Sequence, residues 1–320
     1  MDSSKLPEIT VVIPAFNEAE ALPILLTKLQ NVLRGLSFGL DRCEIIIVND
    51  GSTDCTKKNI IEWCSENFIN IKLINFRKNK GKSAALSAAF FVAAGKVVIT
   101  MDADLQDEPE EIPNLLESLE NGNDLVSGWK KIRHDSLEKR MPSRLFNKVV
   151  SKLSGQKLND FNCGLKAYKK EVIKDLNLYG ELHRFIPVLA AAKGWKVSEI
   201  PVQHHSRAFG VSKYGIERYL RGFLDLATVL FLNRYRARPL HFFGGVGLTF
   251  LFIGFLISLY LSILWFMGFG IGGRPLFFLG MLMIISGFQL FSLGLVGEIL
   301  TNRYESVPDY ELRELTGKNE

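Results

Sequence analysis

Two long apolar runs near the C-terminus restrict the fold of this chain more than any other feature of its sequence. Residues 242–267 and 275–297 are runs of 26 and 23 residues without a charged side chain. At about 1.5 Å of rise per residue, a helix over either run is longer than the roughly 30 Å hydrocarbon core of a bilayer. Buried core helices are rarely so long and so free of charge. The sequence therefore predicts a hairpin of two transmembrane helices within residues 239–300.

Positive charges are distributed unevenly around this hairpin. The turn between the two runs carries only Arg274, whereas arginines precede the first run and follow the second: Arg234, Arg236, Arg238 and Arg303. The positive-inside tendency then places both termini, including a tail at 301–320, in the cytoplasm. The one ionisable residue of the two helices, Glu298, stands at their edge, which is typical of an anchor and not of a transport pathway. Their many glycines are compatible with self-association into a homo-oligomer.

Two further segments have the apolar periodicity of amphipathic helices. Over residues 216–238, apolar side chains recur at helical spacing with charged residues between them, which predicts a helix lying in the membrane interface. Residues 136–155 show the same periodicity, and their polar face is mostly lysine and arginine. Packing against the soluble part of the protein is the alternative for both segments. For residues 136–155 the two interpretations carry nearly equal weight.

The composition of the chain excludes some classes of function. A formal net charge of +5 over 320 residues is too small and too dispersed for a nucleic-acid-binding protein. The N-terminal residues are polar and lack the apolar segment of a cleavable signal peptide. The four cysteines form no C-x-x-C pair and no zinc spacing, which suits a reducing compartment: Cys43, Cys55, Cys64 and Cys163. We therefore expect the soluble part to lie on the cytoplasmic side.

The first 215 residues alternate between strand-like and helical patterns. Strand-like runs cover residues 8–14, 44–50, 71–76, 96–102 and 124–129, and helical patterns run up to about residue 33 and near 55–67, 82–94 and 109–120. Such alternation predicts an α/β fold with a doubly wound, mainly parallel sheet, in which ligands bind at the carboxyl ends of the strands. Polar side chains stand at four of these ends and predict one crevice: Asn17, Glu18, Asp50, Arg77, Asp102 and Asp104.

The sequence lacks the glycine-rich loops of common nucleotide-binding folds. Gly81, Lys82 and Ser83 match the end of a Walker A loop, but Phe76 stands where that loop needs a glycine. No G-x-G-x-x-G sequence follows the first strand, which argues against a dinucleotide-binding domain. The glycine-rich loop of a nucleotidyltransferase is missing from the same place.

Asp102 and Asp104 form an Asp-x-Asp pair at the end of a buried-type strand. If the chain stays extended, both carboxylates point the same way and can share one ion. Mg²⁺ and Mn²⁺ prefer such oxygen ligands, often together with substrate phosphates. An isolated Asp-x-Asp is more often a pair of solvated loop carboxylates. Its place beside three other polar strand ends favours a Mg²⁺ or Mn²⁺ site.

Five segments, in this order and spacing, resemble family 2 glycosyltransferases with the GT-A fold: "VVIPAFNEAEAL", "IIIVNDGSTDCT", "NKGKSAALSAAF", "TMDADLQDEPEEIP" and "DFNCGLKAYKKEV". Together with "HRFIPVLAAAKGW", "HHSRAFGVSKYG" and the two C-terminal spans, the chain is similar to the polyprenyl-phosphate hexosyltransferases. This group contains the dolichyl-phosphate mannose synthases and the bactoprenol glucosyltransferases. The resemblance covers essentially the whole chain.

The resemblance implies that the nucleoside is held by five residues at or just beyond the ends of the first two strands: Pro14, Ala15, Asn17, Glu18 and Asp50. It assigns the metal ion and the diphosphate to Asp102, Asp104 and Gln106. It places four residues near the sugar nucleotide, the last three in an R-x-x-x-x-S-K segment that folds over the phosphates: Lys82, Arg207, Ser212 and Lys213. Lysine and arginine give phosphate charge-assisted hydrogen bonds, which agrees with this role. An ordinary basic surface loop is the alternative for that segment.

The expected acceptor is a lipid phosphate. Processive relatives of the same fold carry a Q-x-x-R-W sequence that this chain lacks, so a single transfer is favoured. Because the second pKa of a phosphate monoester is about 6, the acceptor is an anion at neutral pH and needs no strong base. Arg133, Arg140 and Arg144 are expected to hold it, with arginines that meet lipid headgroups as the alternative. Asp160 is expected to orient the acceptor or the sugar.

The resemblance, together with these patterns, implies an inverting glycosyltransferase that moves one hexose from a nucleotide sugar to polyprenyl phosphate at the cytoplasmic membrane face. UDP-glucose and undecaprenyl phosphate are the expected substrates. A GDP-mannose-dependent mannosyltransferase and a non-catalytic membrane scaffold of the same fold are the alternatives. For the histidines His183, His204 and His205, a structural or substrate-hydroxyl role is favoured over metal binding. The expected parts are a GT-A catalytic domain at 1–215, an interfacial helix at 216–238, two transmembrane helices at 239–300 and the tail.

Overall fold

The computed structural model describes residues 6–67, 70–131, 147–152, 154–205, 217–235, 238–271 and 273–304. The chain divides into two compact units, residues 1–229 and residues 230–320. The first unit contains the sheet and the second contains two long helices, and each is described by itself.

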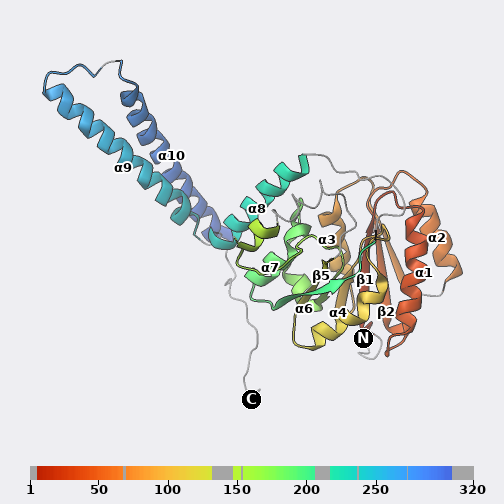
Figure 1. Ribbon diagram of the computed structural model, residues 1–320. Helices are drawn as coiled ribbons and strands as arrows, with labels where there is room; N and C mark the ends of the chain where they lie inside the picture. The colour runs from red at the N-terminus through yellow and green to blue at the C-terminus, as the bar shows by residue number, and fades with distance from the viewer. Residues whose placement is uncertain are drawn as a thin grey trace. The chain divides into compact units, whose positions relative to one another are not determined.

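A seven-stranded sheet forms the centre of the first unit in the part of the chain described (Figure 1). Its strand order is β3-β2-β1-β4-β6-β5-β7. Its strands are β1 (Ile9–Ala15), β2 (Cys43–Asn49), β3 (Ile71–Asn75), β4 (Val97–Thr100), β5 (Leu125–Lys130), β6 (Lys166–Lys169) and β7 (Val197–Val202). All neighbouring strands are parallel except at β6, which runs antiparallel to both β4 and β5. The doubly wound, mainly parallel sheet expected from the sequence is therefore confirmed. Strands β6 and β7 were not expected from the sequence pattern.

Helices cover both faces of this sheet. They are α1 (Ala21–Arg34), α2 (Thr56–Glu66), α3 (Lys82–Val92), α4 (Ile112–Glu120), α6 (Lys170–Asp175) and α7 (Ile186–Ala192), with short 3₁₀ turns η2 (Leu40–Arg42), η3 (Pro109–Glu111) and η4 (Leu182–Phe185). A further helix, α8 (Glu217–Tyr235), crosses the boundary between the two units. Residues of α1, α2 and α4 share one buried apolar cluster with Val11 and Ile13 of β1. On α3, Phe90 meets Tyr168 of β6 edge-on, with ring centroids 5.7 Å apart.

The central strands form because their sequences suit burial on both faces. Every residue of β2 is buried, and β1 is buried apart from Pro14, as expected for parallel strands between two helical layers. Strand β2 also carries a buried carboxylate, Glu44, which accepts hydrogen bonds from Thr10 Oγ1 at 2.6 Å and from the main-chain N–H of Ala94 at 3.0 Å. Lys72 Nζ lies 2.5 Å away. Burial alone would raise the pKa of Glu44, but these donors and the lysine hold it below its ordinary value.

The second unit is a helical hairpin of α9 (Pro239–Phe266) and α10 (Pro275–Tyr304) (Figure 1). Both helices are long and apolar enough to cross a membrane. Glycines line their contact: a Cβ atom at Gly287 would lie 2.8 Å from the carbonyl oxygen of Gly247, and one at Gly254 would lie 2.9 Å from that of Gly280. These glycines are therefore used within the hairpin itself, where they let the two main chains approach. Self-association of the protein through glycines remains a prediction.

Candidate active site

The loops that follow β1 and β2 are joined by the side chain of Asn17. Its Oδ1 accepts a hydrogen bond from the main-chain N–H of Thr53 at 2.8 Å, and its own N–H donates to Ser52 Oγ at 2.9 Å. Asn17 has a φ of 54°, in the left-handed region that asparagine tolerates better than most residues. The next residue, Glu18, donates its N–H to Thr56 Oγ1 at 2.9 Å. The loops that follow β1 and β2 are thus hydrogen-bonded to each other, and the single crevice at four strand ends remains a prediction.

Asp50 connects the end of β2 to the start of α3. Its carboxylate is 4% exposed and accepts two main-chain hydrogen bonds, from Lys80 at 2.7 Å and from Gly81 at 2.9 Å. Gly51 follows with a φ of 69°, and a Cβ atom there would lie 2.5 Å from the main-chain carbon of Lys78. The close approach of these two loops fixes the main chain that leads into Lys82. A role for Asp50 in nucleoside binding remains a prediction.

Asp102 lies between Lys82 and the main chain of Gly164. The side chains of Lys82 and Asp102 form an ion pair and are 27% and 30% exposed. Burial raises the pKa of Asp102, but Lys82 outweighs it and leaves the pKa at about 2. A Cβ atom at residue 164 would lie 2.5 Å from Cγ of Asp102, so a larger residue there would have to displace this carboxylate. The carboxylate is therefore ionised at neutral pH and restricted on two sides.

The chain does not stay extended from Asp102 to Asp104. Strand β4 ends at Thr100, and Leu105 has a φ of 60° in the left-handed region. Asp104 is 7% exposed, and its Oδ1 accepts the main-chain N–H of Gln106 at 3.3 Å. Residues 103 and 104 lie in a turn, so the extended chain assumed in that expectation is not present between the two carboxylates, and their sharing of one ion remains a prediction. A turn, stabilised by Asp104 itself, carries the second carboxylate.

The segment that leaves β7 pairs with the loop that follows this turn. The main-chain N–H of His205 donates to the carbonyl of Gln106 at 3.0 Å, and His204 forms an isolated antiparallel bridge with Asp107. The imidazole of His205 lies 2.9 Å from a carboxylate oxygen of Glu108. His204 and His205 thus join the two segments, and the structural or substrate-hydroxyl role expected from the sequence remains a prediction.

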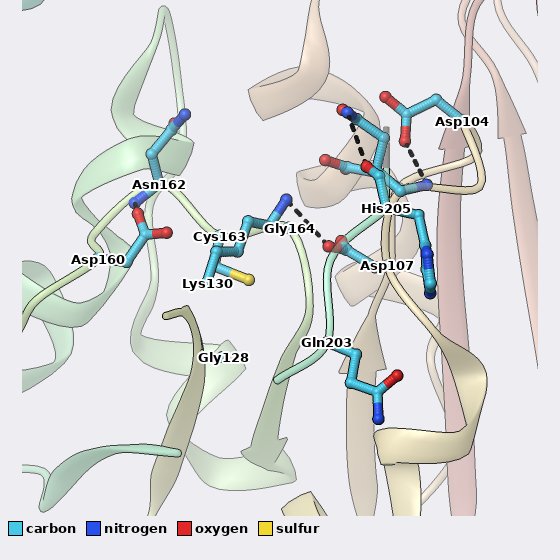
Figure 2. A network of polar contacts seen from close by, with 12 residues as sticks. Asp104, Asp107, Gly128, Lys130, Asp160, Asn162, Cys163, Gly164, Gln203 and His205 are labelled. Atoms are coloured by element: carbon cyan, nitrogen blue, oxygen red, sulfur yellow. Dashed lines mark hydrogen bonds and ion pairs between the residues drawn. The ribbon is translucent and has the colours of Figure 1, made fainter. Parts of the chain in front are cut away.

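A buried ion pair lies beside this loop. Lys130, at the end of β5, places its Nζ 3.0 Å from Oδ1 of Asp107, and Figure 2 shows the two side chains meeting next to Cys163. Burial lowers the pKa of Lys130, but Asp107 outweighs it and the net pKa is raised. Burial, and then the charge of Asp107, raises the pKa of the Cys163 thiol to about 12. The lysine therefore stays charged and the thiol stays neutral at physiological pH.

Asp160 stands at the start of the loop that reaches Gly164. It is 1% exposed, and its Oδ1 accepts the main-chain N–H of Asn162 at 3.1 Å (Figure 2). Lys166 follows in β6, is 3% exposed and donates a hydrogen bond from Nζ to the carbonyl of Cys163. Burial lowers the pKa of Lys166. The loop is thus ordered by its own carboxylate at one end and by a buried lysine at the other.

His183 of η4 lies against the first turn of α3. Its Nδ1 is 3.0 Å from Oγ of Ser83, and its main-chain N–H donates to the same oxygen at 3.0 Å. Burial, and then the charges of Lys82 and Arg184, holds the pKa of His183 well below 6.5. The imidazole is therefore neutral at pH 7 and presents an uncharged polar group near the Lys82–Asp102 pair.

Several expected site residues lie outside the described part of the chain: Arg133, Arg140, Arg144, Arg207, Ser212 and Lys213. Pro14 and Ala15 end β1, next to Asn17. Conversely, the structure brings into the site residues that the sequence pattern missed, namely Asp107, Lys130, Gly164 and Lys166. Lysines at the ends of short strands resemble ordinary surface charges, so nothing in the local pattern marked them. Gly164 lay inside a motif, but its contact with Asp102 needs the fold.

The carboxylates of the site have a composition that suits a divalent cation. Within the described residues, no group of three or more His, Cys, Asp or Glu side chains is placed to hold a metal ion. A site built on Asp102 and Asp104 would therefore need phosphate and water oxygens to complete its coordination. Mg²⁺ and Mn²⁺ are commonly bound in this way, through one or two carboxylates and substrate phosphates. The residues present fit such an ion.

The fold is that of a known family of enzymes. The chain matches the family described as Glycosyl transferase family 2 over residues 10–176. It belongs to this family and is a glycosyltransferase.

Among its relatives is a dodecaprenyl-phosphate galacturonate synthase from Rhizobium johnstonii, 37% identical over 96% of this chain and 93% of the relative. An undecaprenyl-phosphate 4-deoxy-4-formamido-L-arabinose transferase from Photorhabdus laumondii is 32% identical over 100% of this chain and 97% of the relative. A solved mannosyltransferase from Pyrobaculum calidifontis, in complex with GDP-Man and Mn²⁺, has the same fold with a TM-score of 0.53 at 18% identity, covering 94% of this chain and 88% of that chain. A glucosyl-3-phosphoglycerate synthase from Mycobacterium tuberculosis, solved with Mn²⁺ and UDP, gives a TM-score of 0.54 at 17% identity, covering 72% and 79%.

Proposed function

We propose that this glycosyltransferase moves one sugar from a nucleotide sugar to polyprenyl phosphate. The observation that carries the proposal is the whole-length similarity to two transferases whose names include a polyprenyl phosphate, over 96% and 100% of this chain. That similarity extends through the two C-terminal apolar helices as well as the sheet. A lipid acceptor gives these helices a function, because it must be met at a membrane surface.

For the donor sugar, the names of these relatives favour galacturonate or 4-deoxy-4-formamido-L-arabinose. We propose one of these sugars ahead of the glucose expected from the sequence. The nucleoside would lie along the loops joined by Asn17, with Pro14, Ala15, Glu18 and Asp50 around it. Lys82 would contact the diphosphate, helped by Arg207, Ser212 and Lys213.

The metal ion would be Mg²⁺ or Mn²⁺, held by Asp102 and Asp104 with Gln106 beside them. When bound, such an ion neutralises charge on the departing diphosphate. The low pKa of Asp102, about 2, keeps a carboxylate available for it at neutral pH.

The acceptor phosphate would be held by Arg133, Arg140 and Arg144, and Asp160 would orient the acceptor or the sugar. Because the phosphate is already an anion, the protein needs cations to bring it to the donor and needs no strong base. One in-line displacement at the anomeric carbon then inverts its configuration. We assign Asp160 no proton transfer.

The hairpin would anchor the protein in the cytoplasmic membrane, with the catalytic domain and both termini in the cytoplasm. Within the proposed division, residues 1–215 carry out catalysis, residues 216–238 lie in the interface, residues 239–300 span the membrane and residues 301–320 form a tail. Three arginines before α9 support this orientation through the positive-inside tendency.

The test uses the full-length protein in detergent with undecaprenyl phosphate and labelled nucleotide sugars carrying galacturonate, formamido-arabinose, glucose or mannose. We expect label in the extracted lipid with one of the first two donors, and its loss on addition of EDTA. Asp104→Asn should abolish transfer, whereas Asp41→Asn, a surface control on η2, should retain it. No transfer with any donor would refute the proposed reaction. Full activity of Asp104→Asn in excess EDTA would refute the metal assignment.

A further inference from the structure

A loop that leads into β6 lies directly against the side chain of Asp102. We call residues 160–165, which lead into β6, the Asp160 loop. Within it, Gly164 lies so close to Asp102 that a Cβ atom there would reach Cγ of the aspartate at 2.5 Å. Lys82 lies against the same carboxylate as its ion-pair partner. The position of Asp102 therefore depends on where the main chain of the Asp160 loop lies.

Thr100 ties this loop to the strand that carries Asp102. Its Oγ1 donates a hydrogen bond to the carbonyl of Gly164 at 2.8 Å and lies 3.3 Å from the hydroxyl of Tyr168. Thr100 is the last residue of β4, two positions before Asp102, and is 3% exposed. Because this hydrogen bond is shielded from water, no water molecule would take the place of the Thr100 hydroxyl if it were removed.

Lys166 ties the same loop from the other strand. In the antiparallel pairing of β4 and β6 it is the direct partner of Thr100. Its ammonium is buried and donates to the carbonyl of Cys163, the residue before Gly164. A buried ammonium is costly unless it is hydrogen-bonded, so this contact strongly constrains the loop. Two adjacent carbonyls of the Asp160 loop are thus held by two residues that face each other across a strand pair.

We propose that Thr100 and Lys166 are positioning residues that set the carboxylate of Asp102 through the Asp160 loop. The inference rests on the proposed function, in which Asp102 holds the metal ion. Neither residue touches the substrates; both act by keeping Gly164 against Asp102. Loss of either contact lets the loop move, and small displacements of a reacting group can lower rates by up to about a hundredfold.

The test compares Thr100→Val, which keeps the shape of the side chain, with Thr100→Ser, which keeps the hydroxyl. Tyr168→Phe is the matched control, because it removes the second neighbour of Thr100 Oγ1 and leaves the bond to Gly164. Mn²⁺ affinity is measured by electron paramagnetic resonance with UDP present, and kcat and KM are measured separately for donor and acceptor. Thermal unfolding of each variant reports whether it folds.

We expect Thr100→Val to weaken Mn²⁺ binding about tenfold and to lower kcat at least as much, with the acceptor KM unchanged. Thr100→Ser and Tyr168→Phe should have Mn²⁺ affinities and kcat values close to those of wild type. Lys166→Met distinguishes an effect of position from an effect of charge. Removal of a nearby positive charge should by itself strengthen Mn²⁺ binding, whereas displacement of Asp102 should weaken it, and we expect it to be weakened. Gly164→Ala, whose methyl group displaces the carboxylate directly, should resemble Thr100→Val and replaces it if that variant does not fold.

Two results would overturn this inference but not the proposed function. The first is a folded Thr100→Val with wild-type Mn²⁺ affinity and kcat, and the second is an equal loss of Mn²⁺ affinity and kcat in Thr100→Val and Tyr168→Phe. Stronger Mn²⁺ binding by Lys166→Met would remove Lys166 from the proposal. Wild-type protein that neither binds Mn²⁺ nor transfers sugar would overturn the proposed function together with this inference.

Discussion

Replacing Asp50 with asparagine changes one oxygen of a buried side chain into an NH₂ group. Both carboxylate oxygens now accept main-chain hydrogen bonds, from Lys80 at 2.7 Å and Gly81 at 2.9 Å, and the residue is 4% exposed. Asparagine can accept only one of these bonds, and that bond loses its charge. The other main-chain N–H then faces the NH₂ group of a side chain that is almost fully buried. The loop before α3 therefore loses most of its support.

The size of the effect follows from these two bonds. Weakening a charge-assisted bond to a neutral one costs about 1 kcal/mol, and leaving a buried N–H without an acceptor costs about 1–3 kcal/mol. The sum is about 2–4 kcal/mol, which for a domain of this size lowers the Tm by roughly 5–15 °C. Asp54→Asn is a matched control: Asp54 also accepts two main-chain bonds, from Thr56 at 3.0 Å and Ala19 at 3.3 Å, but it is exposed. Water can replace the lost acceptor there, so the expected cost is below about 1 kcal/mol.

The assay is thermal unfolding followed by tryptophan fluorescence, with nucleotide binding measured by calorimetry on the same samples. Asp50→Asn should have a clearly lower Tm than Asp54→Asn, and weaker nucleotide binding because Lys82 follows the released loop. A Tm for Asp50→Asn within about 2 °C of wild type, or equal losses in the two variants, would refute this account of the loop.

Three further predictions follow from the pKa values and the glycine contacts. Because the pKa of Asp102 is about 2 in the folded protein and about 3.9 in an unfolded chain, its stabilising contribution should be present above about pH 4 and be lost as the pH falls to about 2. Urea unfolding at each pH should show that the free energy of unfolding falls less with acidification in Lys82→Met than in wild type. An equal fall in the two proteins would contradict the ion pair. Cys163, with a thiol pKa of about 12, should resist maleimide at pH 8 while the exposed Cys55 reacts; rapid labelling of Cys163 in folded protein would be inconsistent with its burial. Gly287→Val should destabilise the α9–α10 hairpin by about 1–3 kcal/mol, because its Cβ would lie 2.8 Å from the carbonyl oxygen of Gly247. The control is Gly245→Val, whose Cβ meets nothing within 4 Å and which should leave the stability unchanged. Stability is measured by denaturation in sodium dodecyl sulfate, and equal effects of the two variants would rule out this packing.

The sequence predicts those parts of the fold in which one pattern dominates. The runs at β1 and β2 are apolar at almost every position, so their burial between helices could be foreseen. Strand β6 reads KAYK, with a lysine at each end, and β7 is mostly half-buried, so neither shows a run that local rules recognise. Their places in the sheet follow from pairing with β4 and β5, which is a property of the whole fold.

In the candidate site, too, some features could be predicted from local sequence patterns and others depend on the whole fold. The polar residues that end β1, β2 and β4 could be gathered from the sequence, because parallel strands bring their carboxyl ends to one edge. The turn after Asp102 could not, since the left-handed residue is Leu105, a type that rarely adopts this conformation. Lys130 and Lys166 also escaped notice, because a lysine is buried only when tertiary structure supplies its partner.

The glycine contacts within the hairpin also bear on how the protein is made. Three glycines of α10, Gly280, Gly287 and Gly294, recur every seven residues and so lie along one side of the helix, where α9 packs. Two helices that fit each other this closely leave no room for lipid between them, so we expect them to enter the bilayer as a preassembled pair. A bulky residue at one of these positions would then interfere with insertion of the hairpin into the membrane during biosynthesis. It would reduce the amount of protein that reaches the membrane, while each molecule that does arrive keeps its catalytic rate.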